Sequence, residues 1–383
     1  MKICVATGTR AEYGLLKPLI DKIKLVKEWQ LQLLVTASHL SPEFGLTYKQ
    51  IENDGLNIDA KVEMLLSSDT AEGVVKSMGL GMIGFADALK VLQPDLIVIL
   101  GDRYEMLALA SAALIYKIPV AHISGGETTE GAYDDSIRHS ITKMSHLHFT
   151  STEDYSKRVI QLGENPSNVY TVGALGLDNT LSSNLLSKKE VEDELQISFK
   201  KYNYLVAFHP ETLAKESSES QFRILLNALD RQDDSFFVFT KANADTDGRI
   251  INQMMKEYVL KNKEKAVMFP SLGSQLFLSV MKIVNAVVGN SSSGIVEAPS
   301  LHTPTINIGN RQKGRIQSDA VLNAEMNVDD ISSCFEKIKS RDFQDAVKNA
   351  SNPYGGGKAT DKIVEALKSV NMASFQTKLF YDL

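Results

Sequence analysis

The sequence predicts an α/β protein with two domains, each built on a parallel sheet covered by helices on both faces. Strand-like and helix-like segments alternate from one end of the chain to the other. With 383 residues, the chain is longer than one hydrophobic core usually serves. Most predicted strands also end in glycine and polar residues, as strands do at the ligand-binding edge of an open parallel sheet.

In the first half of the chain, the strands are short apolar runs, the pattern of strands buried on both faces. They are predicted at residues 3–7, 31–36, 95–100, 119–123, 147–150 and 168–172. Helical periodicity is present at residues 12–27, 43–54, 75–92 and 134–145, and between Arg103 and residue 116. Glycines weaken the prediction for two of these helices, at Gly45 and within 75–92.

The second half repeats this alternation. Strands are predicted at residues 204–208, 236–240, 266–269, 283–288 and 305–308, and helices at 217–229, after Gly248 and at 359–370. A change to polar, serine-rich sequence at residues 173–186 marks the domain boundary. We therefore predict a first domain at 1–175, a second at 176–365 and a C-terminal segment at 366–383.

Composition excludes several classes of protein. Hydrophobic residues make up 43% of the chain and the net charge is −6, which argues against a general nucleic-acid surface. Cys4 and Cys334 lie far apart and form neither a disulfide framework nor a zinc motif. Because no signal-peptide pattern or long apolar run is visible, we expect a cytoplasmic protein without membrane contact.

Residues 283–298 carry the strongest local pattern. A buried strand is followed by Gly289, Asn290, three serines and Gly294, and then by a helix containing Glu297. Free backbone N–H groups at such a turn bind anions, and the hydroxyls of Ser291, Ser292 and Ser293 add donors. The alternative is an ordinary strand–helix turn with a serine N-cap.

Carboxylates gather after two of the predicted strands. Asp102 follows one strand, and Glu127, Glu130, Asp134 and Asp135 follow the next. Carboxylates held close together acquire spread pKa values, which suits general acid and base chemistry. For one of the two aspartates, the pattern favours a helix cap over a catalytic role. Two sheets facing each other across a cleft would bring these acids and the serine turn to one ligand.

Basic side chains complete the predicted site. His209 precedes a proline and therefore lies on a strand-exit loop, while Arg10 and Arg311 can neutralise a diphosphate. The sequence contains neither the P-loop motif nor the Gly-x-Gly-x-x-Gly fingerprint, which disfavours ATP hydrolysis and nicotinamide binding. Since no metal-ligand spacing is present either, we predict no metal and no cofactor.

The sequence as a whole resembles the UDP-N-acetylglucosamine 2-epimerases, specifically their hydrolysing branch. The resemblance rests on the motifs Thr7-Gly8-Thr9-Arg10-Ala11-Glu12-Tyr13, Gly101-Asp102-Arg103, His122-Ile123-Ser124-Gly125-Gly126-Glu127, Asp134-Asp135-Ser136-Ile137-Arg138-His139, Phe208-His209-Pro210, Gly289-Asn290-Ser291-Ser292-Ser293-Gly294 and Asn307-Ile308-Gly309-Asn310-Arg311-Gln312. It implies the GT-B fold, with two Rossmann-like domains and a nucleotide sugar in the cleft between them. It also implies a C-terminal helix that crosses back to the first domain, and a homodimer or homotetramer.

The resemblance further implies a reaction and a set of roles. UDP leaves by anti elimination to give 2-acetamidoglucal, and water then adds to give N-acetylmannosamine, a precursor of sialic acid. The implied acids and bases are Asp102, Glu127, Asp134 and Asp135, and the implied substrate contacts are His209, Arg10, Arg103, Asn243, Ser291, Ser292, Ser293, Gly294, Glu297 and Arg311.

One residue departs from the family pattern. Many relatives have a glutamate where this chain has Ser124, and a serine is not a competent base at neutral pH without activation. The role passes to Glu127 or Glu130, or the substrate differs. The alternative substrate is N,N′-diacetylbacillosamine carried by UDP or GDP, on the route to legionaminic acid. A GT-B glycosyltransferase is the less favoured alternative from a different class, and a nucleotide-sugar-binding regulator without chemistry is a third, weaker one.

Overall fold

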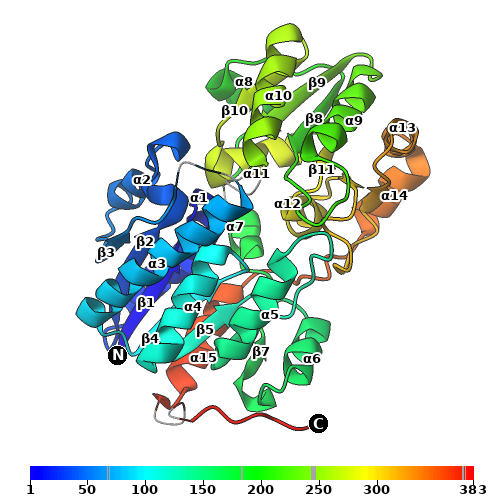
Figure 1. Cartoon of the computed structure of the whole chain (residues 1–383). Coiled ribbons are helices and arrows are strands. Elements are labelled where there is room, and N and C mark those ends of the chain that lie inside the picture. The colour runs from blue at the N-terminus through cyan, green and yellow to red at the C-terminus, as the bar shows by residue number, and fades with distance from the viewer. Residues whose placement is uncertain (67, 69, 183, 243–246, 373–374, 376) are drawn as a thin grey trace. The chain divides into compact units, whose positions relative to one another are not determined.

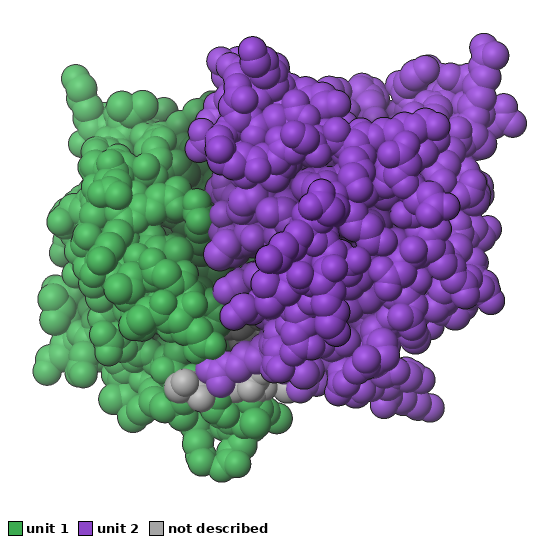
Figure 2. Space-filling view, turned by 90° about the horizontal axis from the view of Figure 1, so that it is seen from above, with its two compact units in different colours: residues 1–127, 134–179, 357–383 green, residues 128–133, 180–356 purple. Residues whose placement is uncertain are grey.

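The computed structural model describes the chain except for residues 67, 69, 183, 243–246, 373–374 and 376. Its described residues form two compact units, coloured separately in Figure 2. The first comprises Met1–Glu127, Asp134–Asn179 and Gly357–Leu383, and the second comprises Thr128–Tyr133 and Thr180–Gly356. The main unit boundaries thus follow residues 179 and 356, whereas the boundaries predicted from the sequence follow residues 175 and 365. In addition, the short segment Thr128–Tyr133 is counted with the second unit.

The first unit is built on a parallel sheet of seven strands in the order β3-β2-β1-β4-β5-β6-β7 (Figure 1). Its strands are β1 (Lys2–Thr7), β2 (Gln30–Thr36), β3 (Ala60–Val62), β4 (Leu96–Leu100), β5 (Val120–Ile123), β6 (Leu147–Thr150) and β7 (Val169–Thr171). Its helices are α1 (Arg10–Leu25), α2 (Tyr48–Asn53), α3 (Ala71–Leu92), α4 (Tyr104–Tyr116), α5 (Asp134–Met144), α6 (Glu153–Gln161) and α15 (Ala359–Ser369), together with the start of α7 (Gly176–Ser182), which continues past the unit boundary at residue 179.

Alternate residues of each strand in this sheet point to opposite faces, and both faces are buried. Ile3 and Val5 belong to the apolar cluster formed with α1 and α15. Cys4 and Ala6 belong to the cluster formed with α3 and α4 on the other face. The continuous apolar runs of the sequence are explained by this arrangement, because neither face of the sheet meets water.

The second unit has a parallel sheet of six strands in the order β10-β9-β8-β11-β12-β13. Its strands are β8 (Tyr202–Ala207), β9 (Ser235–Thr240), β10 (Ala266–Phe269), β11 (Ala286–Gly289), β12 (Thr305–Ile308) and β13 (Val321–Ala324). Its helices are α8 (Lys188–Leu195), α9 (Ser218–Asp230), α10 (Gly248–Lys261), α11 (Gly273–Ile283), α12 (Ser292–Val296), α13 (Val328–Lys337) and α14 (Arg341–Asn349).

Aromatic side chains dominate one face of this second sheet. Tyr204 stacks on Phe237 with ring centroids 5.6 Å apart, and the edge of Phe335 from α13 meets Tyr204 at 4.9 Å. Offset and edge-to-face pairs of this kind add about 0.5–1.5 kcal/mol beyond the area that they bury. The core therefore ties β8, β9 and α13 together.

The predicted fold class is confirmed: the chain is an α/β protein with two parallel sheets and helices on both faces of each. Two local predictions are wrong. Residues 43–54 are not one helix, because Gly45 adopts a left-handed conformation (φ +85°) between the short 3-10 helix Pro42–Phe44 and α2. The strand predicted at 283–288 begins only at Ala286, because Ile283 still belongs to α11.

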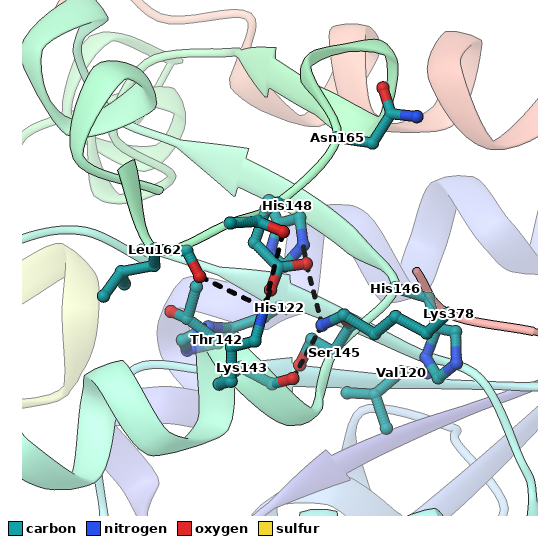
Figure 3. Close-up of polar contacts among 12 residues, drawn as sticks. Val120, His122, Thr142, Lys143, Ser145, His146, His148, Leu162, Asn165 and Lys378 are labelled. Atoms are coloured by element: carbon teal, nitrogen blue, oxygen red, sulfur yellow. Dashed lines mark hydrogen bonds and ion pairs between the residues drawn. The ribbon is translucent and has the colours of Figure 1, made fainter. Parts of the chain in front are cut away.

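The C-terminal part of the chain packs within the first unit. Both oxygens of Asp178 accept hydrogen bonds from the start of α15, at 2.8 Å from the Ala359 nitrogen and 2.6 Å from the Thr360 nitrogen. Farther along, the Lys378 ammonium reaches the buried carboxylate of Glu164, 2.7 Å away, which also contacts His148 (Figure 3). A polar anchor thus holds each end of this segment.

No helix among the described residues is long and apolar enough to cross a bilayer.

Candidate functional site

Two neighbouring strands of the first sheet bring acidic residues to the same edge. β4 and β5 pair in parallel with Leu100 opposite Ile123, so the residues that follow them lie side by side. Gly101 and Asp102 follow the first, and the segment leading to Glu127 follows the second.

Arg138 of α5 connects these acids. Its guanidinium pairs with the Asp102 carboxylate through Nη2, and its Nη1 donates to the Ser124 carbonyl at 2.9 Å. The same Nη1 lies 3.6 Å from Oε2 of Glu127. With only 3% of the Arg138 side chain exposed, these contacts are little weakened by solvent. One buried cation thereby fixes two carboxylates at one edge.

Glu127 is itself held in place from a second direction. Its side chain is 6% exposed, and its Oε1 accepts a hydrogen bond from the Ser151 hydroxyl at 2.8 Å. Such a carboxylate keeps one orientation, which general acid or base chemistry requires.

The two aspartates at the start of α5 differ in their partners. Asp134 is the first residue of the helix, and Asp135 lies 3.5 Å from Nε2 of His139 one turn later. Burial lowers the pKa of His139, and the Asp135 carboxylate opposes that shift. The Asp135 carboxylate and the His139 imidazole are therefore held together on one face of α5.

His122 supports the turn that carries Asp102, a role that the sequence analysis missed. Its Nε2 lies 2.7 Å from the Gly101 carbonyl, and its Nδ1 lies 3.1 Å from the Thr142 hydroxyl. Burial lowers the pKa of His122 to about 3, so the ring is neutral and Nε2 carries the proton. Gly101 is left-handed (φ +77°), and the histidine stabilises its carbonyl there.

The turn after β1 presents Arg10 at the start of α1. The Arg10 Nε is buried without a hydrogen-bond partner among the described residues, and burial lowers the pKa of its guanidinium. Arg103, at the start of α4, is instead paired with Glu105 at 2.8 Å. Arg10 thus retains an unused Nε donor among the described residues.

In the second unit, Asn290 organises the predicted phosphate site. Its side chain is fully buried; Oδ1 accepts from the His209 nitrogen at 2.7 Å, and Nδ2 donates to the His209 carbonyl at 2.8 Å. The Asn290 carbonyl in turn accepts from Arg311 at 3.1 Å and from Gln312 at 2.8 Å. The structure therefore brings His209 and Arg311 together through a residue that was named in the motif but given no role.

Glycines let the serine turn pack tightly. A Cβ on Gly289, whose φ is +133°, would lie 2.1 Å from the Ala207 carbonyl oxygen, and one on Gly294 would lie 2.7 Å from the Thr305 methyl. Ser291 caps α12 by accepting from the Ser293 nitrogen at 3.4 Å, and Glu297 follows the last residue of this five-residue helix. Ser291, Ser292, Ser293 and Glu297 are all partly exposed.

Glu130 and Asn243 differ from the other predicted residues in where they lie. Glu130, a member of the predicted acidic cluster, belongs to the second unit and faces Lys313 at 3.8 Å. Asn243, predicted to line the sugar side, falls outside the described residues.

Within the described part of the chain, no group of three or more histidine, cysteine, aspartate or glutamate side chains is arranged to hold a metal ion. Both cysteines are buried free thiols, and burial raises the pKa of Cys4 to about 12, so it is unreactive at neutral pH.

Comparison with known proteins identifies the family of this chain. The model of the family "UDP-N-acetylglucosamine 2-epimerase" matches residues 21–368. The chain is 47% identical over 383 residues to the "GDP/UDP-N,N'-diacetylbacillosamine 2-epimerase (hydrolyzing)" of Campylobacter jejuni, covering 100% of this chain and 99% of the relative. It is 38% identical over 384 residues to the "Polysialic acid biosynthesis protein P7" of Escherichia coli, covering 100% and 97%.

Among solved structures, the Methanocaldococcus jannaschii UDP-GlcNAc 2-epimerase in complex with UDP-GlcNAc and UDP superposes with a TM-score of 0.79. The superposition covers 97% of this chain and 100% of that one at 22% identity, which supports the GT-B fold. Taken with the family match over most of the chain, these findings show that the chain belongs to the UDP-N-acetylglucosamine 2-epimerase family.

Proposed function

We propose that this protein is a hydrolysing 2-epimerase of N,N′-diacetylbacillosamine linked to UDP or GDP. The observation that carries the chemistry is the buried Arg138, which holds Asp102 and Glu127 at one sheet edge. The substrate is taken from the relative that is 47% identical over the whole chain. N-Acetylglucosamine linked to UDP, which the sequence analysis ranked first, becomes the second candidate, because it agrees with the description of the family model.

In the proposed reaction, one carboxylate removes the proton from C2 of the sugar while the C1–O bond to the nucleotide breaks. The bonding electrons leave with the diphosphate, and a glycal remains. Water then adds its oxygen to C1, and a proton is delivered to C2 from the opposite face. We assign these proton transfers to Asp102, Glu127, Asp134 and Asp135, since an elimination and an addition on opposite faces need more than one acid or base.

The departing diphosphate requires cations and hydrogen-bond donors. We assign this work to His209, Arg311 and the turn Ser291–Ser293 with Gly294 in the second unit, and to Arg10 and Arg103 in the first. Glu297 would accept from the ribose hydroxyls, and Asn243 would line the sugar. That these two groups of residues close on one ligand is part of the proposal.

Ser124 bears on the choice of sugar. Its φ is +65°, a left-handed conformation, and its carbonyl accepts from Arg138. The Ser124 carbonyl is thus occupied by the hydrogen bond from Arg138. The Ser124 side chain is too short and too weakly basic to replace the glutamate of other relatives. This departure from the family pattern supports a substrate other than UDP-N-acetylglucosamine in the proposal.

The test is a panel of UDP- and GDP-linked N,N′-diacetylbacillosamine and N-acetylglucosamine incubated in deuterated water, with products identified by NMR. We expect free nucleotide and a C2-inverted free sugar that carries deuterium at C2, formed fastest from diacetylbacillosamine. Faster turnover of UDP-N-acetylglucosamine would favour the second candidate. Release of the uninverted sugar without deuterium would indicate a glycosyltransferase and contradict the proposal.

We further propose that the protein acts in the cytoplasm as a homodimer formed through α3. Val75 and Ile83 on this helix are each 67% exposed, and residues 78–86 contain no charged or hydrogen-bonding side chain. Exposed apolar patches of this kind mark interaction surfaces. The reduced thiols of Cys4 and Cys334 fit a cytoplasmic location.

Charges around the patch favour a second copy of the same chain as the partner. Along α3, Glu72 precedes Gly81 by as many residues as Lys90 follows it. Lys76 and Asp87 are placed almost symmetrically about Gly81 in the same way. In an antiparallel pair of α3 helices, Glu72 would therefore meet Lys90 of the second copy, and Lys76 would meet Asp87. Symmetric association of this self-complementary kind is the commonest form of oligomer.

Charge exchange tests this interface. Asp87→Lys should weaken the dimer by placing lysines opposite each other, and adding Lys76→Asp should restore it, as measured by sedimentation equilibrium. The exchange of Arg231 and Asp329, an exposed ion pair on the second unit, serves as the matched control. A monomeric wild type, or a dimer unaffected by Asp87→Lys, would contradict the assignment.

A further inference from the structure

Two buried glutamates face the same glycine beneath the turn that carries Arg10. Glu12, in the first turn of α1, is 8% exposed, and Glu105, in the first turn of α4, is fully buried. Oε2 of Glu12 accepts hydrogen bonds from the Gly8 nitrogen at 2.8 Å and the Thr9 nitrogen at 3.0 Å. A Cβ on Gly8 would lie only 2.6 Å from Oε1 of Glu105, so the two carboxyl groups approach this residue from different helices.

Each carboxyl group has one oxygen with a partner and one without. Oε1 of Glu105 accepts from the Arg103 Nε at 2.8 Å, while its Oε2 has no hydrogen-bond partner among the described residues. Oε1 of Glu12 is likewise buried and lacks a partner there. Two buried carboxylate oxygens left without donors would be costly, because a buried charge needs a hydrogen bond or a counter-ion.

Few charges are available to offset a second negative charge. Arg103 is the cation whose field acts on Glu12, and it already donates to Glu105. His39, which packs nearby against Thr7, has its pKa lowered to about 4 by burial and is neutral. Burial and the Glu105 charge raise the pKa of Glu12 to about 8, against the opposing effects of Arg103 and the Gly8 and Thr9 amides.

We propose that Glu12 and Glu105 hold one proton between their free oxygens and that this pair positions the turn Gly8–Arg10 and the side chain of Arg103. The protonated carboxyl donates to the carboxylate, which satisfies both orphaned oxygens at once. The outer oxygens remain acceptors for the Gly8 and Thr9 amides and for Arg103. Both glutamates are positioning residues, since neither carboxyl group is assigned to the reacting sugar.

Glutamine substitutions test the shared proton directly. In Glu12→Gln, the amide oxygen can accept from Gly8 and Thr9 while the NH₂ group donates to Glu105. In Glu105→Gln, the amide oxygen can accept from Arg103 while the NH₂ group donates to Glu12. Each single variant therefore supplies permanently the donor that the wild type obtains by protonation. In the double variant two NH₂ groups face each other and the pairing is lost.

The sign of the pH dependence follows from linkage. A carboxyl whose folded pKa is raised contributes stability that is present in full below its unfolded pKa of about 4.5 and is lost as pH rises to about 8. Wild-type melting temperature should therefore fall across this window relative to either single variant. The double variant should melt below both single variants at every pH, by more than their separate effects add up to.

Glu190 provides a matched control because it occupies the same capping-box position in α8 but is exposed. Hydrogen bonds to Ser187 lower its pKa, so Glu190→Gln should lose stability relative to the wild type as pH rises, the opposite direction. Infrared spectra of protein labelled with ¹³C-glutamate should show a protonated carboxyl band at pH 7 that is absent from both single variants.

These measurements need no substrate, so they stand or fall separately from the proposed function. The consequence for activity rests on that function: the KM for the nucleotide sugar should rise above pH 8 in the wild type but not in Glu12→Gln. Absence of the infrared band, together with strictly additive Glu12→Gln and Glu105→Gln effects on melting, would overturn the shared proton.

Discussion

At the scale of single residues, the polar side chains of the candidate site fall into two groups: those predicted to act on the substrate, and those that hold them in place. Asp102, Glu127 and His209 were predicted from their positions after strands, and such positions are readable in a sequence. Their supports are Arg138, His122 and Asn290. These contacts join residues far apart in the chain, so local sequence patterns could not predict their distances.

Arg138 provides the first residue-scale prediction. Arg138→Met should lower kcat/KM by about 10²- to 10⁴-fold, the range for loss of an acid or base, because Asp102 and Glu127 would repel each other and reorient. The pH–rate profile should shift to higher pH, since both carboxylates lose their counter-ion. Arg223→Met, which breaks the exposed Glu219 pair, is the control. An unchanged pH profile would show that Arg138 does not set these carboxylates.

Asn290 provides the second. Asn290→Ala removes both hydrogen bonds between this side chain and the His209 backbone, and such a bond is worth about 0.5–1.5 kcal/mol. We expect a lower melting temperature together with weaker binding of UDP or GDP, measured by calorimetry. Asn307→Ala, on the neighbouring strand β12, is a suitable comparison, because Asn307 bonds Asn323 and not the predicted phosphate site. Equal loss of nucleotide affinity in both variants would argue against the role of Asn290.

At the scale of elements, the buried strands and long helices were predictable because their apolar patterns directly reflect burial on both sheet faces. Two short strands, β3 and β13, were not predicted. β3 has three residues, and β13 lies at the sheet edge with exposed positions that break its pattern. Only packing against the neighbouring strands identifies such segments, and that packing is a tertiary property.

The start of α15 allows an element-scale prediction. Asp178→Ala removes the acceptor for the Ala359 and Thr360 amides and should destabilise the first unit by about 0.5–2 kcal/mol, as other N-cap losses do. Chemical denaturation measures this effect. Ser340→Ala removes the N-cap of α14 in the second unit and should act on that unit alone. Asp178→Asn, which keeps an acceptor, should recover part of the loss.

At the scale of the whole molecule, each unit has its own sheet and two apolar clusters, one on each face. The number of domains and their class were predictable from length and alternation. The placement of Thr128–Tyr133 with the second unit was not. Some of its bonds to that unit join backbone groups, such as the Glu130 nitrogen and the Lys313 carbonyl at 3.2 Å, and these bonds leave no mark in the sequence.

The anchor at Glu164 predicts how the protein responds to acid. Burial would raise the pKa of Glu164, but hydrogen bonds from His148, Lys143 and Lys378 outweigh it and lower the pKa to about 2. Because this folded pKa is depressed, its stabilising effect is present above about pH 4.5 and is lost as pH falls toward 2. Melting temperature should thus drop over this range, and less steeply in Glu164→Gln. Parallel curves for the two proteins would contradict the assignment.

The segment Thr128–Tyr133 also constrains protein engineering. If residues 180–356 were exchanged for those of a relative with another nucleotide preference, the six residues Thr128–Tyr133 would remain from this chain and would contact the residues of the relative. The donors of the hydrogen bonds to this segment would then be replaced. These donors include the Leu213 nitrogen, which bonds the Gly131 carbonyl, and the Arg315 side chain, which bonds the Thr128 carbonyl. Hybrid proteins should therefore fold best when Thr128–Tyr133 and the second unit come from the same parent.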